Sequence, residues 1–299
     1  MLRRILTFPL TRLVIAVVVF LLIGTAVSFA LALLTTTPAG LLTGEIVQAL
    51  AALGALLFVG LVIERRSLAQ IGFPRDRALP DLGRGLLLGA ILLTLVVGIM
   101  ALAGWYRVLG FAWQGLSENA AAVALAGLVL TAVIAIAEEV IFRGVFFRIV
   151  EEWVGSWIAL ALSALLFGLA HVSNPNSSLW AGIAIGLEAG VLFGAIYIFS
   201  RGLWFPIGLH WTWNYFEGWV YGTPVSGIAV PGLINSTTEG PIHCTGGAFG
   251  PEASVVAVVV CGGAGLYYLV RCHQERRIYT PSWLARLTHQ LPSQPLSTG

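Results

Sequence analysis

Long apolar segments separated by short polar ones dominate this sequence. The pattern predicts eight membrane-spanning helices, near residues 13–34, 41–64, 84–104, 120–142, 157–172, 178–200, 203–221 and 253–271. A helix needs about 20 residues to cross a bilayer, so the fifth segment is short, the seventh is marginal, and seven spans is the alternative. The apolar run after "MLRR" is longer than the core of a usual signal peptide, which favours an uncleaved first span.

Composition agrees with this class of protein. Hydrophobic residues make up 58% of the 299 residues and charged residues only 10%, and the mean hydropathy is +0.91. A soluble domain does not need so much apolar surface, so we expect an all-α polytopic integral membrane protein. The net charge of +2 comes from arginines spread between the apolar segments, and nucleic acid is therefore not an expected partner.

The arginines alternate from loop to loop. Residues 1–12 carry three and residues 65–84 carry five, whereas the segments 35–40, 173–177 and 222–252 carry none. This alternation follows the positive-inside rule with both termini in the cytoplasm. We divide the chain into N-terminal helices (1–119), a core (120–271) and a cytoplasmic tail (272–299). The expected location is the plasma membrane, in a bacterium the inner membrane.

Three charges lie within the fourth apolar segment, in "AIAEEVIFRGVFF" at residues 135–147. A charge at the centre of a bilayer costs about 2.5–3.5 kcal/mol on insertion scales. Glu139 and Arg143 are four residues apart and can pair on one helix face. Glu138 points about 100° away from Glu139, so its carboxylate is free to act as a general base. The alternative is an ion pair that only holds helices together.

Further polar residues lie in later spans. His171 ends the fifth segment, and His210 and Asn214 share one face of the seventh, where both side chains can donate hydrogen bonds to a single oxyanion. A glutamate and a histidine can together activate a water molecule. Glu45, Glu188 and Glu217 also fall within predicted spans. We interpret Glu45 as structural and the other two as possible supporting residues.

Small and aromatic residues also form patterns. The glycines of "GIAIGLEAGVLFG" recur every fourth residue and indicate close helix packing rather than a cofactor site. The tryptophans near residues 204–219 suit either an interfacial belt or the wall of a cavity.

The polar motifs together resemble those of a known family. "EEVIFRG" reads as EExxxR, "FGLAH" as FxxxH and "HWTWN" as HxxxN, in this order on successive spans. Over residues 120–220 the chain is similar to the CAAX prenyl endopeptidase and bacteriocin-processing (CPBP) intramembrane proteases. The segment "TGGAFGPEAS" is similar to a closing segment found in a bacterial subgroup.

The resemblance implies an eight-helix membrane protease whose site opens towards the cytoplasm and whose substrate is a peptide or a lipidated (CAAX-like) protein within the lipid membrane. It implies that Glu138 and His171 activate the attacking water, that His210 and Asn214 stabilise the oxyanion, and that Glu139 and Arg143 position the helix. Glu138, His171 and His210 also form a possible zinc-binding set, although the sequence contains no HExxH and a metal-free glutamate mechanism is favoured.

Two other functions stay open at this stage. A proton-coupled transporter can use buried Glu and His as a relay, and a non-proteolytic chaperone or immunity protein can keep the same fold. The depths of the residues provide a test. Measured from the arginine-marked loops, His171 lies about 20 Å and His210 about 10 Å along their helices at 1.5 Å per residue. The helices must tilt, or begin at different depths, for these residues to meet.

Overall fold

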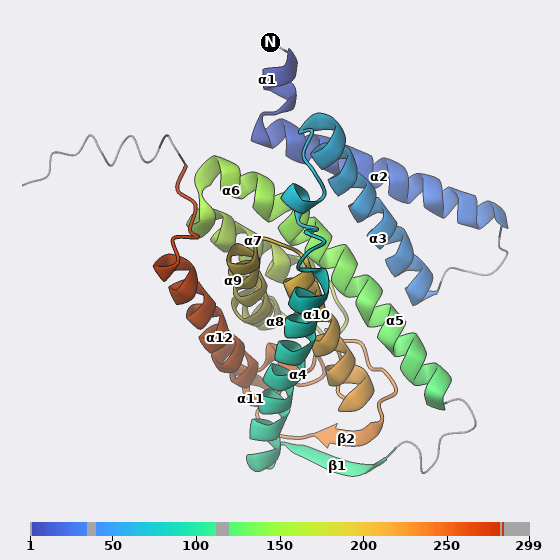
Figure 1. Ribbon diagram of the computed structural model, residues 1–299. Coiled ribbons are helices and arrows are strands. Elements are labelled where there is room, and N and C mark those ends of the chain that lie inside the picture. The colour runs from blue at the N-terminus through green and yellow to red at the C-terminus, as the bar shows by residue number, and fades with distance from the viewer. Residues whose placement is uncertain (1, 35–39, 112–119, 282, 284–299) are drawn as a thin grey trace, which may run out of the picture.

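The computed structural model describes residues 2–34, 40–111, 120–281 and 283, and these form a mostly helical bundle (Figure 1). All eight predicted segments are helical. The first helices are α1 (Leu2–Leu6), α2 (Pro9–Leu34), α3 (Leu41–Leu57) with η1 (Phe58–Ile63), η2 (Ala69–Ile71) and α4 (Ala78–Leu102). The core has α5 (Ala120–Glu139), η4 (Val140–Phe147), α6 (Arg148–Val154), α7 (Ser156–His171), α8 (Leu179–Ile185), η5 (Gly186–Gly190), α9 (Val191–Ser200), α10 (Trp204–Asn214), η6 (Tyr215–Val220) and α12 (Val255–Gln274).

Among the residues that the structure describes, six helices are long and apolar enough to cross a membrane. Ser156–His171 is a shorter apolar helix, and the helix from Trp204 is not among the six, so the number of spans stays a prediction. Most of the expected tail, residues 284–299, lies outside the described residues.

The fourth predicted span, residues 120–142, is shorter than the helix that the structure contains. The helix continues from α5 through the π-helical η4 into α6 and ends at Val154. The charges after residue 142 suggest a helix end, but Arg143 pairs with Glu139 of the same helix and later charges pair with residues from other segments. Arg148 pairs with Glu64, and Glu151 pairs with Arg201. Paired charges are compatible with burial where single ones are not.

A tight turn joins α6 to α7 at Gly155. This glycine has φ +88°, and a Cβ here would lie 2.9 Å from a ring carbon of Pro281, so a larger residue is excluded. Glu138 precedes Gly155 by 17 residues and His171 follows it by 16. Because the helices run in opposite directions from this turn, the two residues lie at a similar height, about 25 Å from it at 1.5 Å per residue.

Glycines allow two helix pairs to pack closely. On α4, a Cβ at Gly85 or Gly89 would lie within 2.4 Å of a backbone carbonyl oxygen of α10. A Cβ at Gly168 of α7 would lie 2.2 Å from the carbonyl oxygen of Gly182 of α8. The packing role predicted for the glycines of residues 182–194 is therefore confirmed at Gly182. Together, the two close helix pairs fix α7 and α10, which carry the two motif histidines.

The fold also contains a small β-sheet that the all-α prediction missed. β1 (Tyr106–Phe111) pairs antiparallel with β2 (Ile234–Thr238), and with α11 (Ile242–Thr245) and η7 (Pro251–Ala253) it lies at one end of the bundle (Figure 1). Its strands are short, and β2 is the polar sequence "INSTT". Such strands become stable through pairing and not through an apolar pattern of their own. We call this side of the bundle the sheet end.

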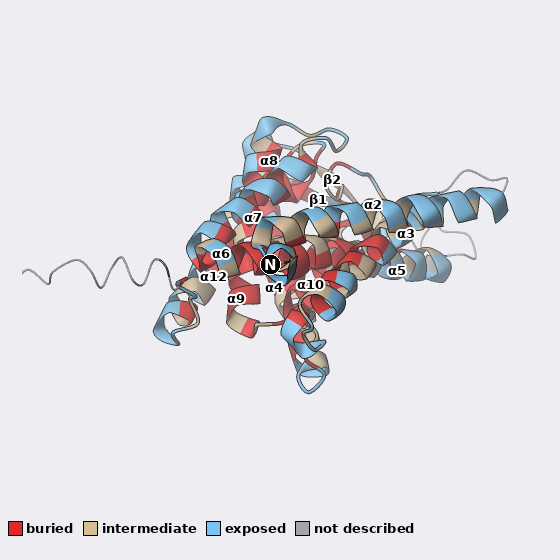
Figure 2. Cartoon of the chain, turned by 90° about the horizontal axis from the view of Figure 1, so that it is seen from above, coloured by how far each residue is buried: buried red, intermediate tan, exposed pale blue. Residues whose placement is uncertain are grey.

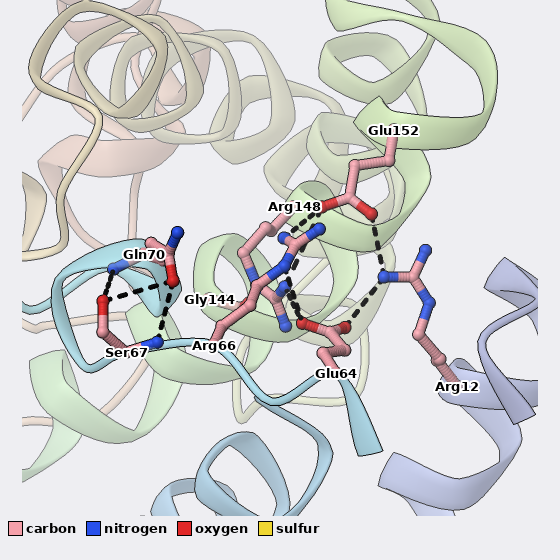
Figure 3. Close-up of polar contacts among 8 residues, drawn as sticks. All are labelled: Arg12, Glu64, Arg66, Ser67, Gln70, Gly144, Arg148 and Glu152. Carbon is pink, nitrogen blue, oxygen red and sulfur yellow. Dashed lines mark hydrogen bonds and ion pairs between the residues drawn. The ribbon is translucent and has the colours of Figure 1, made fainter. Parts of the chain in front are cut away.

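The opposite side of the bundle carries the arginines. Arg12 of α2 contacts Glu64 and Glu152 at 2.8 Å, Arg148 contacts Glu64 at 2.6 Å, and Arg66 pairs with Glu152 (Figure 3). The predicted grouping of the arginine-bearing loops at one face is therefore confirmed. Most of α2 is otherwise exposed (Figure 2), so these ion pairs attach its first turns to the bundle.

The C-terminal part of the chain joins the same end. The Arg201 guanidinium lies 2.7 Å from Glu151 and also donates to the carbonyl oxygen of Arg277, whose own guanidinium donates to Phe199. We call the region of these contacts and of Arg12, Glu64, Arg66, Arg148 and Glu152 the arginine-rich end.

Candidate active site

An ion pair at the junction of α5 and η4 forms the base of the site. Arg143 Nη1 lies 2.9 Å from Glu139 Oε1, and both side chains are fully buried. The i, i+4 pair predicted from the sequence is therefore present. The helix widens into a π-helix just after Glu139, a feature that is frequent at functional sites.

The guanidinium of Arg143 contacts several helices through its two terminal nitrogens and its flat faces. Its Nη2 donates to the carbonyl oxygens of Ala189 and Gly190 at 3.3 Å, and its carbon Cζ lies 4.5 Å and 5.1 Å from the ring centres of Phe167 and Phe193. These contacts connect α5 to α7 and to the α8–α9 helix, as expected for a positioning residue.

Both histidines present Nε2 to the same carboxylate. His171 Nδ1 donates to the carbonyl oxygen of Phe167 at 2.7 Å, and His210 Nδ1 donates to Glu139 Oε1 at 3.0 Å. These acceptors assign the proton to Nδ1 in each ring. The Nε2 atoms lie 3.9 Å (His171) and 4.0 Å (His210) from Glu138 Oε2. The two histidines and Glu138 therefore converge, because helix α5 crosses the bundle obliquely (Figure 1).

These groups line a cavity of about 430 Å³. Glu138, His171, His210 and Asn214 all border it. Glu138 Oε2 is buried and has no hydrogen-bond partner among the described residues. An unsatisfied carboxylate oxygen next to two imidazoles is a binding position for a water molecule or a polar substrate atom.

The structure adds residues that sequence reasoning had assigned otherwise or missed. Glu45, which the sequence analysis interprets as structural, lines the cavity together with Glu188. Glu217 is fully buried and lies close to Glu252. Trp213 and Glu252 also line the cavity. Trp213 lies within HWTWN and belongs to the tryptophans for which a cavity wall was one of two predicted roles, and Glu252 lies within TGGAFGPEAS, although no role of its own was predicted for it.

Trp213 differs from the other tryptophans in its hydrogen bonding. The indole N–H of Trp180, Trp204 and Trp211 each donates to a backbone carbonyl oxygen. The indole nitrogen of Trp213 is buried and has no partner within the described residues. The tryptophan cluster of residues 204–219 is thus divided, with Trp213 and Trp219 in the cavity wall.

The cavity lies towards the sheet end. Its wall includes residues from the connection between α7 and α8 and from the segment between η6 and α12. These residues are Asn174, Val225, Ser226, Ile228, Val230 and Glu252. None of its lining residues belongs to the described connections of the arginine-rich end. The two sequence expectations, termini in the cytoplasm and a site open to the cytoplasm, therefore do not agree with each other.

Zinc binding by Glu138, His171 and His210 would require a particular spacing of their ligand atoms. Two imidazoles and a carboxylate have the right chemistry, but tetrahedral bonds of 2.0–2.1 Å place ligand atoms about 3.3 Å apart. The observed separations from Glu138 are 3.9 Å and 4.0 Å, and within the described chain no group of three or more metal-binding side chains is close enough to hold an ion. The present geometry does not fit zinc.

Comparisons with known proteins agree with the motifs. Residues 119–216 match the model of the type II CAAX prenyl endopeptidase Rce1-like family. A search of curated proteins finds no match to the chain. The matched residues include Glu138, Glu139, Arg143, His171, His210 and Asn214. With six helices of spanning length, the protein is a membrane protein, and the segment that holds this site is similar to the Rce1-like type II CAAX prenyl endopeptidase family.

Proposed function

We propose that the protein is an intramembrane endopeptidase that hydrolyses a peptide bond in a membrane-proximal or lipid-modified (CAAX-like) protein or peptide. The observation that carries this proposal is the unpartnered Oε2 of Glu138, 3.9 Å from His171 Nε2 in the wall of a cavity. The family match supports a protease in general, and the reaction assigned to these residues is our inference.

The attacking water fits between Glu138 and His171. Both groups are hydrogen-bond acceptors, because His171 has its proton on Nδ1, and a water molecule has two hydrogens to donate. Two acceptors 3.9 Å apart can each lie about 2.8 Å from one water oxygen. As the water attacks the substrate carbonyl carbon, Glu138 accepts one proton and later delivers it to the leaving amine, so that the reaction uses no other reagent.

The oxyanion of the tetrahedral intermediate is assigned to α10. His210 in its imidazolium form donates through Nε2, while Glu139 accepts from its Nδ1 and balances the charge. Asn214 lies one helical turn further and donates from its amide. Arg143 holds Glu139 in place, so the pair positions His210 without touching the substrate.

The test compares purified wild type with Glu138→Gln. The reporters are a prenylated peptide ending in a CAAX tetrapeptide and a library of unmodified peptides. Loss of the base should lower kcat by about 10²- to 10⁴-fold, and Glu275→Gln, at an exposed ion pair outside the cavity, should keep the wild-type rate. Equal rates for wild type and Glu138→Gln would contradict the role of Glu138. Absence of cleavage by the wild type would contradict the peptidase.

The arginine pattern supports an orientation in which both termini lie in the cytoplasm, and the composition supports the plasma membrane, in a bacterium the inner membrane. Membrane lipid then surrounds the exposed apolar faces of α2, α3 and α5.

A further inference from the structure

The cavity and the arginine-rich end lie at different levels of the bundle. Glu45 of α3 borders the cavity, and 19 residues separate it from Glu64 at the arginine-rich end. At 1.5 Å per residue this is about 28 Å along one nearly continuous helix, close to the thickness of the apolar part of a bilayer.

The walls of the cavity show which end it reaches. Val225, Ser226, Ile228 and Val230 lie in the connection between η6 and β2, and Glu252 lies in η7, all at the sheet end. Ser226 is held in place by Glu252, whose Oε2 accepts from both its backbone N–H and its hydroxyl group. Ile228 is exposed, so the wall continues to the surface of the protein on this side.

The charge of the two ends sets their orientation. Among the sheet-end connections, only Arg107 carries a positive charge, whereas the arginine-rich end gathers residues from five separate parts of the chain. Retention of arginine-bearing loops in the cytoplasm is the main determinant of topology in helical membrane proteins. The sheet end is therefore the end that is translocated across the membrane.

We propose that the cavity opens on the extracytoplasmic side of the membrane. Its substrate is then a peptide segment presented at the outer surface, such as the membrane-proximal part of an exported or membrane-anchored protein, and not a tail modified and presented in the cytoplasm. The orientation stands on charge and geometry alone, while the identity of the substrate as a peptide rests on the proposed function.

A native cysteine provides the first test. Cys244 is half-buried in α11 at the sheet end, and the other two cysteines are buried. In intact cells a membrane-impermeant maleimide should label the protein at Cys244, and Cys244→Ser should abolish the labelling. In the Cys244→Ser background, Glu239→Cys at the exposed sheet end should be labelled in intact cells, whereas Ser67→Cys at the arginine-rich end should be labelled only after lysis. The reverse pattern would overturn the orientation.

Activity in oriented vesicles gives the second test. A soluble peptide reporter with a charged fluorophore, which cannot cross the membrane, is added to right-side-out or inside-out vesicles containing wild type or Glu138→Gln. We expect cleavage by wild type at least tenfold faster in right-side-out vesicles and none by Glu138→Gln. Faster cleavage in inside-out vesicles would overturn the proposal. The expected labelling pattern without cleavage in either orientation would instead refute the peptidase and leave the orientation of the cavity intact.

Discussion

The buried pair of Glu139 and Arg143 allows a quantitative test of what holds the site together. The two charged groups are 2.9 Å apart and fully buried, which at an effective dielectric constant of about 20 corresponds to an attraction of about 6 kcal/mol. Desolvation offsets much of this attraction, but removal of one partner leaves the other charge buried alone, and such changes cost about 3–5 kcal/mol.

The two single variants should not cost the same. In Glu139→Gln, the buried guanidinium of Arg143 keeps only carbonyl oxygens and aromatic rings as partners. In Arg143→Met, the Glu139 carboxylate keeps the hydrogen bond from His210. We therefore expect Glu139→Gln to lie at the upper end of that range. The double variant should cost less than the sum, because no unpaired charge remains.

Thermal unfolding in detergent, followed by intrinsic tryptophan fluorescence, measures these effects. A loss of 3–5 kcal/mol corresponds to roughly 6–10 °C in Tm for a chain of this size. Single variants that lose less than about 1 kcal/mol, or a double variant whose cost equals the sum of the singles, would refute the reasoning that the pair is a coupled, buried structural unit.

Three other predictions concern separate features. Trp213→Phe should keep or raise the Tm because it removes a buried N–H without a partner, whereas Trp211→Phe, which loses a hydrogen bond to a backbone carbonyl, should lower stability by about 1 kcal/mol; a greater loss in Trp213→Phe would be contrary to this. Glu64→Gln, which removes the charge between Arg12 and Arg148, should lower the free energy of unfolding by about 3 kcal/mol and speed limited proteolysis of α2; unchanged proteolysis would show that α2 is held by other contacts. Treatment with a chelator should leave peptidase activity unchanged, and loss of activity that zinc restores would show that the cavity contracts around a metal.

Local rules were sufficient for the helices and for one part of the site. Apolar runs located all eight helical segments, and the helix period separated Glu139, which pairs with Arg143, from Glu138, which does not. The arginine spacing correctly predicted that several loops meet at one end. Each of these inferences depends only on neighbours in the sequence or on the sign of a charge.

Other features depend on partners far away in the chain. The sequence places the end of the fourth span at residue 142, because Arg148 looks like a loop residue until Glu64 is seen beside it. The β-sheet was missed because β1 and β2 stabilise each other across more than 120 residues. For Glu45, the sequence contains nothing that separates a structural carboxylate from one that borders a cavity.

The sequence by itself determined the class of protein, the positions of the helices and the identities of the motif side chains, because hydropathy, helical period and residue chemistry are local properties. Only the tertiary structure decided that Glu138 lies within 4.0 Å of both histidines and that the cavity adjoins the sheet end. The physical reason is that the depth of each side chain depends on several features together. These are the close packing of α4 on α10 and of α7 on α8, the turn at Gly155 and the oblique course of α5. No single stretch of sequence determines their combined effect.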